Sequence, residues 1–133
     1  MMTVALAGAL ATMSTLPVAA DDFMQFRSPT GNIGCGYAAH VLRCDVIGGI
    51  VPLPPTPNSC QFDWGQGFWL HSTGKAQVVC AGDTALDHAA PVVAYGATWK
   101  HGGFLCASSV NGFRCTNAEG HGFTIARGEA HRF

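Results

Sequence analysis

The sequence predicts an all-β protein, a small antiparallel β-sandwich or barrel cross-linked by three disulfides. The 133 residues include seventeen glycines and seven prolines, which leave few uninterrupted windows. No segment carries apolar residues at the i, i+3, i+4 spacing of a surface helix. Short runs of β-branched and aromatic residues recur instead, each bounded by turn residues. The six cysteines are even in number, as a disulfide framework requires.

The strands are separated by glycine, proline, asparagine and aspartate, which favour turns for distinct conformational reasons. Three of these turns are Gly48-Gly49, Ser72–Gly74 and Gly102-Gly103. The expected strands, in chain order, are Phe23–Phe26, Ile33–Tyr37, Val41–Ile47, Phe68–His71, Gln77–Ala81, Val92–Tyr95, Phe104–Ser108, Phe113–Asn117 and Phe123–Arg127.

Two connections carry expectations of their own. Pro52–Pro57 is proline-rich and lies just before Cys60. Because proline donates no backbone hydrogen bond, this segment cannot lie inside a sheet, and we expect an ordered surface crossing. If the domain contains any helix, Thr84–Ala90 is the best place for a single turn, because Asp83 or Thr84 can cap it.

The first twenty residues have the composition of a signal peptide. They contain no charged side chain, and Val18 and Ala20 occupy the two small-residue positions of a cleavage site. Their apolar run is shorter than the about 20 residues of a membrane-spanning helix. We therefore predict a signal peptide at residues 1–20 and a single disulfide-rich β-domain at residues 21–133. The mature domain is expected to be secreted or envelope-associated, without a membrane span; an uncleaved anchor is the alternative.

The charge of the chain argues against two classes of partner. The formal net charge is −1, and 11% of the residues are charged. Nucleic acids and anionic membranes are bound through clusters of positive charge, which this composition does not supply. No Cys-x-x-Cys or His-Glu-x-x-His spacing occurs. We therefore expect no metal and no cofactor.

The cysteines are predicted to pair as Cys35–Cys44, Cys60–Cys80 and Cys106–Cys115. Opposed residues of an antiparallel hairpin have a constant index sum, so pairing Cys35 with Cys44 also opposes Tyr37 to Leu42. Opposed Cα atoms lie about 4.5–5.5 Å apart, within the reach of a disulfide. The loop of this hairpin is then Ala38–Val41.

The last cysteine pair allows two strand registers. Local pairing opposes Ser108 to Phe113 and leaves the loop Ser109–Gly112, whose final glycine suits a left-handed conformation. A two-residue Asn111-Gly112 turn would oppose Ser108 to Cys115 instead. We expect the local pairing because no other cysteines are equally close in the chain.

Several short segments together resemble a known family. They are Ser28-Pro-Thr-Gly-Asn-Ile-Gly-Cys35, Arg43-Cys-Asp45, Asp63-Trp-Gly65, Cys80-Ala-Gly-Asp-Thr84, Tyr95-Gly96, the Cys106 and Cys115 pair, and Gly120-His-Gly-Phe-Thr-Ile-Ala-Arg127. In this order they are similar to a domain-of-unknown-function family of small exported, cysteine-rich proteins common in actinobacteria. The resemblance implies an exported disulfide-rich domain, and it implies no activity and no functional residue.

The aromatic stretch from Phe62 to Trp69 has two interpretations. Trp64, Phe68 and Trp69 could stack on sugar rings, with Asp63 as a hydrogen-bonding neighbour. Aromatic side chains also dominate the cores of small β-domains, and that interpretation is favoured. Phe68 and Trp69 point to opposite faces of a strand, so one of them can be exposed.

His121 lies between two glycines and completes the weak set of candidate ligand-binding residues. Asp63, His71, Asp83 and His121 could instead assemble the site of a small secreted hydrolase. Asp83 follows a glycine, however, which is more typical of a turn than of a catalytic carboxylate. No residue is predicted to be catalytic.

The leading hypothesis is an exported, non-enzymatic domain that binds an unknown protein or glycan at or outside the cell envelope. It rests on the lack of a catalytic motif and on a rigid β-scaffold, whose loops usually carry recognition. The alternatives are the small hydrolase and a protease inhibitor that inserts Pro52–Pro57 into its target.

Overall fold

The computed structural model describes residue 8 and residues 23–133. The predicted signal peptide therefore lies outside the described residues, apart from Gly8. Among the described residues, no helix is long and apolar enough to cross a membrane.

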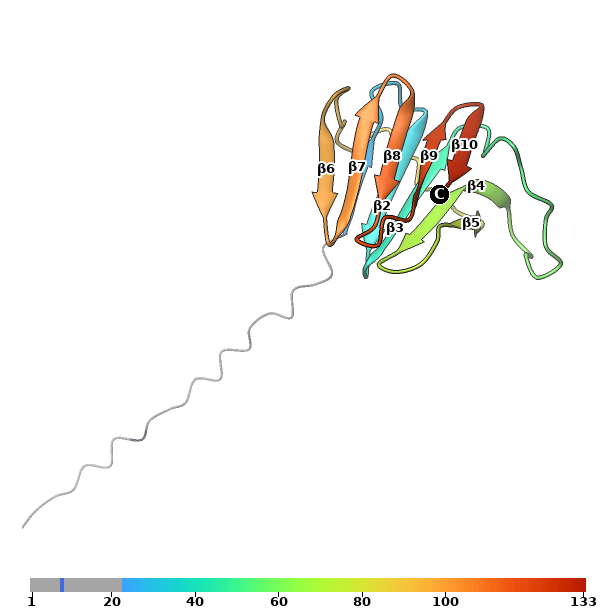
Figure 1. The fold of residues 1–133 in the computed structure, drawn as a ribbon, viewed down its shortest axis with the longest axis horizontal. Helices are drawn as coiled ribbons and strands as arrows, with labels where there is room; N and C mark the ends of the chain where they lie inside the picture. The colour runs from blue at the N-terminus through green and yellow to red at the C-terminus, as the bar shows by residue number, and fades with distance from the viewer. Residues whose placement is uncertain (1–7, 9–22) are drawn as a thin grey trace, which may run out of the picture.

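In this described part of the chain, ten strands form two antiparallel five-stranded sheets that pack face to face as a sandwich (Figure 1). Sheet A has the order β1-β2-β3-β4-β5, with strands Met24–Arg27, Ile33–Ala38, Val41–Val46, Trp64–His71 and Gln77–Cys80. Sheet B has the order β10-β9-β8-β7-β6, and from β6 to β10 its strands are Thr98–His101, Phe104–Ser109, Gly112–Thr116, Gly122–Ala126 and Glu129–Arg132. The all-β prediction is confirmed.

The core lies between the sheets because alternate side chains of each strand face the other sheet. Phe26, Leu42 and Phe68 of sheet A and Phe113 and Phe123 of sheet B are at most 2% exposed. The ring centroids of Phe26 and Phe113 lie 5.8 Å apart, and those of Phe68 and Phe123 lie 5.3 Å apart. These contacts join the sheets along the length of the sandwich.

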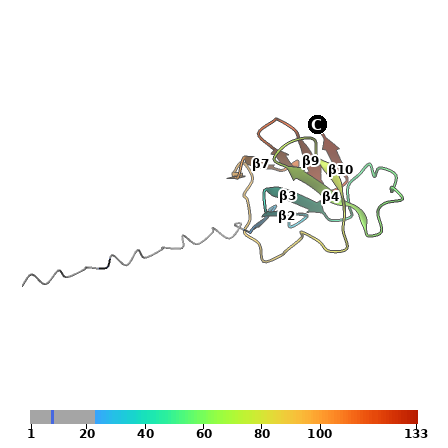
Figure 2. The same cartoon turned by 90° about the horizontal axis from the view of Figure 1, so that it is seen from below.

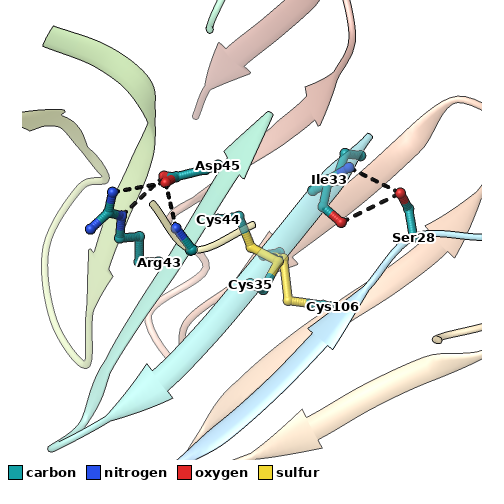
Figure 3. The surroundings of a disulfide bond; sticks show 9 residues. Ser28, Ile33, Cys35, Arg43, Cys44, Asp45 and Cys106 are labelled. Atoms are coloured by element: carbon teal, nitrogen blue, oxygen red, sulfur yellow. Dashed lines mark hydrogen bonds and ion pairs between the residues drawn. A yellow bond between two sulfur atoms is a disulfide. The ribbon is translucent and has the colours of Figure 1, made fainter. Parts of the chain in front are cut away.

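The three disulfides are those predicted, Cys35–Cys44, Cys60–Cys80 and Cys106–Cys115. Both hairpin registers are confirmed, and the rival register of the second hairpin is wrong. The two hairpin disulfides meet in the core, where Sγ of Cys44 lies 4.0 Å from Sγ of Cys115; Figure 3 shows Cys106 of sheet B beside Cys35 and Cys44. This cluster of sulfurs is oxidised, whereas the sulfur ligand of a metal is the thiolate.

The predicted strands need correction: one does not form, one begins earlier than expected, and two further strands are present. Val92–Tyr95 is not a strand, since Val92 makes only a single parallel bridge to Arg27. β4 begins at Trp64 rather than at Phe68. β6 and β10 were not expected, because both are short and largely exposed, and their extended form comes from pairing with β7 and β9.

Residues 81–93, which we call the crossing segment, cover the outer face of sheet A. β5 lies at one edge of this sheet, whereas the next strand, β6, lies above the opposite edge, where Trp99 stacks on Phe26 of β1. The chain therefore crosses the outside of sheet A between them (Figure 2). It passes so close to β2 that a Cβ at Gly34 would lie 2.6 Å from the carbonyl oxygen of Ala85.

No helical turn forms at Thr84–Ala90, the best place for one. The crossing segment bonds to sheet A at its end: the backbone N–H of Arg27 donates to the carbonyl of Pro91, and that of Val93 donates to the carbonyl of Arg27. Within the segment, one backbone bond, from the N–H of Ala90 to the carbonyl of Asp87, closes an isolated turn. A capping residue alone does not determine a helix, because the sheet offers the backbone other partners.

The turn between β2 and β3 contains two non-glycine residues with positive φ. Ala38 pairs with Val41, so the turn has two residues, Ala39 (φ 50°) and His40 (φ 62°), and is shorter than the loop expected. Turns of this type favour Asn-Gly, because both residues must adopt left-handed conformations.

The double substitution Ala39→Asn, His40→Gly is expected to raise the free energy of unfolding by about 1–2 kcal/mol. A left-handed conformation costs an ordinary residue roughly 1–2 kcal/mol and costs asparagine and glycine less. The 3.4 Å contact between His40 Nδ1 and the Tyr37 hydroxyl would be lost, which offsets part of the gain. Urea unfolding of the oxidised protein measures the change; unaltered or lower stability would contradict the prediction.

Candidate binding groove on the outer face of sheet A

Arg43 and Asp45 lie side by side on the outer face of β3. They alternate with Leu42, Cys44 and Val46, which face the core. Figure 3 shows both charged side chains on the side of β3 away from the disulfide. Although they point outward, Arg43 is only 6% exposed and Asp45 is fully buried, because the crossing segment lies over them.

This charged pair holds the crossing segment onto sheet A. Arg43 binds Asp45 through two hydrogen bonds, Nε to Oδ1 at 3.0 Å and Nη2 to Oδ2 at 2.8 Å. Asp45 Oδ2 also accepts the backbone N–H of Ala85 at 2.8 Å. Arg43 in turn donates to the side chain of Asp83 at 2.7 Å and to its carbonyl at 2.9 Å. Bidentate pairs of this kind fix geometry as well as charge.

The contacts of Arg43 with Asp45 and Asp83 also affect the protonation of these groups. Burial alone would lower the pKa of Arg43, but hydrogen bonds to Asp45 and Asp83 raise it above its usual value. The hydrogen bond from Arg43, together with its positive charge, holds the pKa of Asp83 below its usual value. Asp83 is therefore ionised at neutral pH. The Arg43 guanidinium also lies over the Trp69 ring, 5.0 Å from its centroid, which orients the indole.

Arg43, Trp69 and Asp83 border a groove of about 230 Å³, which we call the sheet A groove. Its walls include Phe23, Gln25, Trp69, Asp83 and Thr84, and its lining also includes Gly36. A Cβ at Gly36 would meet no atom within 4 Å, so the missing side chain leaves this part of the groove open. Strands β1 to β4 and the crossing segment thus form one concave surface.

Three polar groups in the groove are free to bind a ligand. Among the described residues, neither the Gln25 amide nor the Trp69 indole N–H has a hydrogen-bond partner, and Asp83 uses only Oδ1. An amide both donates and accepts, an indole donates, and a carboxylate oxygen accepts. The groove therefore presents both kinds of hydrogen-bonding group next to an aromatic ring.

The family model for a family of unknown function, DUF6636, matches residues 5–133. The chain belongs to this family. The membership confirms the resemblance to a domain-of-unknown-function family, and the three disulfides agree with its cysteine-rich character. No curated protein and no solved structure matches the chain.

In this family member, the predicted aromatic residues do not lie together. Trp69 borders the sheet A groove, whereas Phe68, on the opposite face of β4, is 2% exposed in the core. Trp64 is half-buried at the start of β4, where its Nε1 donates to the carbonyl of Pro54 at 2.8 Å. Asp63 is exposed just before that strand. The alternation of a strand explains why consecutive aromatics separate.

The predicted carboxylate and imidazole residues are not brought into one cluster. Asp63 precedes β4 and His71 ends it, and eight residues of strand span about 25 Å. Asp83 is bound to Arg43. His121 is half-buried beyond β8, where its backbone N–H donates to Asn117. Asn117 bonds the backbones of both His71 and His121, so these two residues lie at one end of the sandwich. The hydrolase alternative stays a prediction.

The proline-rich segment lies in the long connection between β3 and β4, which extends away from the sheets (Figure 1). Cys60–Cys80 and the Trp64–Pro54 hydrogen bond anchor its base. Leu53 is 55% exposed. The inhibitor alternative stays a prediction.

The Arg43–Asp45 pair and Gln25 were not recognised as site residues from the sequence. One signal for the pair was available: two opposite charges flank a core cysteine in a strand, so both must lie on one outer face. No local feature of the sequence indicates that a distant segment covers this face.

Proposed function

We propose that this chain is an exported, non-enzymatic domain that binds a glycan of the cell envelope in the sheet A groove. The observation that carries the proposal is the placement of Trp69, oriented by Arg43, beside the free polar groups of Gln25 and Asp83. A sugar ring combines an apolar C–H face with hydroxyl groups along its edge. An aromatic face and nearby acceptors and donors match that pattern.

A glycan suits this groove better than a protein does. The groove of about 230 Å³ is a small concavity, just below the about 300–1,000 Å³ of typical small-molecule sites, whereas a protein partner needs an extended interface. Three disulfides support export, because disulfides persist in oxidising compartments outside the cytosol. The composition of residues 1–20 supports it as well.

The substitution Gly36→Leu is expected to weaken glycan binding about tenfold or more while the protein remains folded. The added side chain enters open space in the groove, and φ at this glycine is not in the left-handed region. A tenfold change corresponds to about 1.4 kcal/mol of binding free energy. The measurement is affinity electrophoresis or calorimetry with purified envelope polysaccharides, preceded by an array to select them.

Ala107→Leu is the matched control, because it enlarges an exposed side chain on the outer face of sheet B. It should bind as the wild type does. The proposal fails if the oxidised wild-type protein binds no envelope glycan of the array, or if Gly36→Leu binds as tightly as Ala107→Leu.

A further inference from the structure

A second groove, of about 200 Å³, lies at the end of the sandwich where four turns meet. It lies near the start of β2, whereas the sheet A groove reaches the end of that strand. We call it the end groove; the residues that line it include Ser28, Thr30, Asn32, Tyr95, Val110 and Arg127.

The turns around the end groove are held by hydrogen bonds. The turn between β1 and β2 is closed by Ser28, whose N–H donates to the carbonyl of Ile33 at 2.9 Å and whose hydroxyl accepts the Ile33 N–H at 3.1 Å. The turn that carries Tyr95 is tied to β7 by Ser108, whose carbonyl accepts the N–H of Gly96 at 2.8 Å and whose hydroxyl donates to Val93 at 3.0 Å. The groove is therefore preformed.

Its polar groups are available and carry net positive charge. Arg127 lies on the turn between β9 and β10, and none of the described residues that line the groove with it is acidic. Within the described part of the chain, the Arg127 guanidinium, the Tyr95 hydroxyl and the Asn32 amide make no hydrogen bond. The other four arginines have partners. Arg43 is ion-paired and Arg114 lies over the Phe133 ring. Arg27 and Arg132 donate to the backbone carbonyls of Ala90 and Ala76.

We propose that the end groove binds the carboxylate of a small ligand. A guanidinium donates two parallel hydrogen bonds to a carboxylate. The Tyr95 hydroxyl and the Asn32 amide can donate to the same anion or to its neighbouring polar groups. Exposed Val110, at 78%, supplies an apolar wall. Such a carboxylate can come from a uronic acid or from the end of a peptide. The inference is independent of the proposed function.

The test is an NMR titration of the oxidised, isotope-labelled full chain. One arm uses glucuronate with glucose as its neutral control; the other uses N-acetyl-dialanine with its amide. We expect one acid to shift the backbone signals around Thr30, Asn32, Tyr95 and Arg127 and its neutral control not to do so. Raising the ionic strength should weaken this binding, because the site is near the surface.

Arg127→Gln is expected to weaken binding about tenfold through loss of a charge-assisted hydrogen bond. Lys75→Gln is the matched control, because Lys75 is an exposed cation at the opposite end of sheet A. Gly36→Leu should bind the acid normally, which separates this test from that of the sheet A groove. The inference is overturned if neither acid binds in preference to its neutral control, or if Arg127→Gln and Lys75→Gln bind alike.

Discussion

The substitution Asp45→Ala is expected to lower the free energy of unfolding by about 3–5 kcal/mol. Removing Asp45 takes away the buried partner of the Arg43 charge, which then keeps only Asp83, an exposed carboxylate, as its counter-ion. Arg43 cannot relieve this cost by losing its proton, because an arginine remains charged in proteins. The crossing segment also loses the acceptor of the Ala85 N–H. Urea unfolding of the oxidised protein gives the change.

Two variants separate the ion pair from general effects of mutation. Asp63→Ala removes an exposed carboxylate without a side-chain hydrogen bond and should change stability by about 0.5 kcal/mol or less. The double variant Arg43→Met, Asp45→Leu replaces both charges by apolar groups and should recover much of the loss. A loss below about 1 kcal/mol for Asp45→Ala would mean that the pair does not hold the crossing segment.

The substitution Asn117→Ala is expected to cost about 2–4 kcal/mol. This buried side chain joins the two sheets at one end of the sandwich: its amide donates to the carbonyls of His71 and Gly74, each at 3.0 Å. Its oxygen accepts the backbone N–H groups of Glu119 at 3.0 Å and His121 at 3.1 Å. Each such bond contributes about 1 kcal/mol, and the partners left unpaired in the interior add to the loss.

Thermal and urea unfolding measure this effect. Asn117→Asp keeps the two acceptor contacts but directs a carboxylate at two carbonyl oxygens, so at neutral pH it should be at least as destabilising as alanine. Asn58→Ala is the control, since Asn58 is exposed in the connection between β3 and β4. If Asn117→Ala were as stable as Asn58→Ala, the four bonds would not join the sheets.

Much of the sheet structure follows from local pattern. Alternation around Cys35 and Cys44 gave the register of β2 and β3, and the same rule placed Cys106 opposite Cys115. β6 and β10 escaped detection because edge strands bury little apolar surface, so exposed residues such as Lys100 and His131 carry no periodic signal.

The candidate site was harder to predict from the sequence than the strands were. Trp69 was recognised as a candidate because an aromatic stretch is visible in any sequence. Its partner Arg43 lies opposite it on the neighbouring strand β3. Asp83 reaches Arg43 only because the crossing segment passes over this face of the sheet. That path follows from strand order: β5 and β6 lie at opposite edges of different sheets.

The sequence by itself determined the all-β class, the three disulfides and the register of the two cysteine hairpins, because these depend on spacing over a few residues. Only the tertiary structure decided that the hairpin disulfides meet in the core, that residues 81–93 cover Arg43 and Asp45, and that Trp69 borders a groove. Those features depend on which surfaces bury each other across long separations in the chain, and no local pattern encodes that choice.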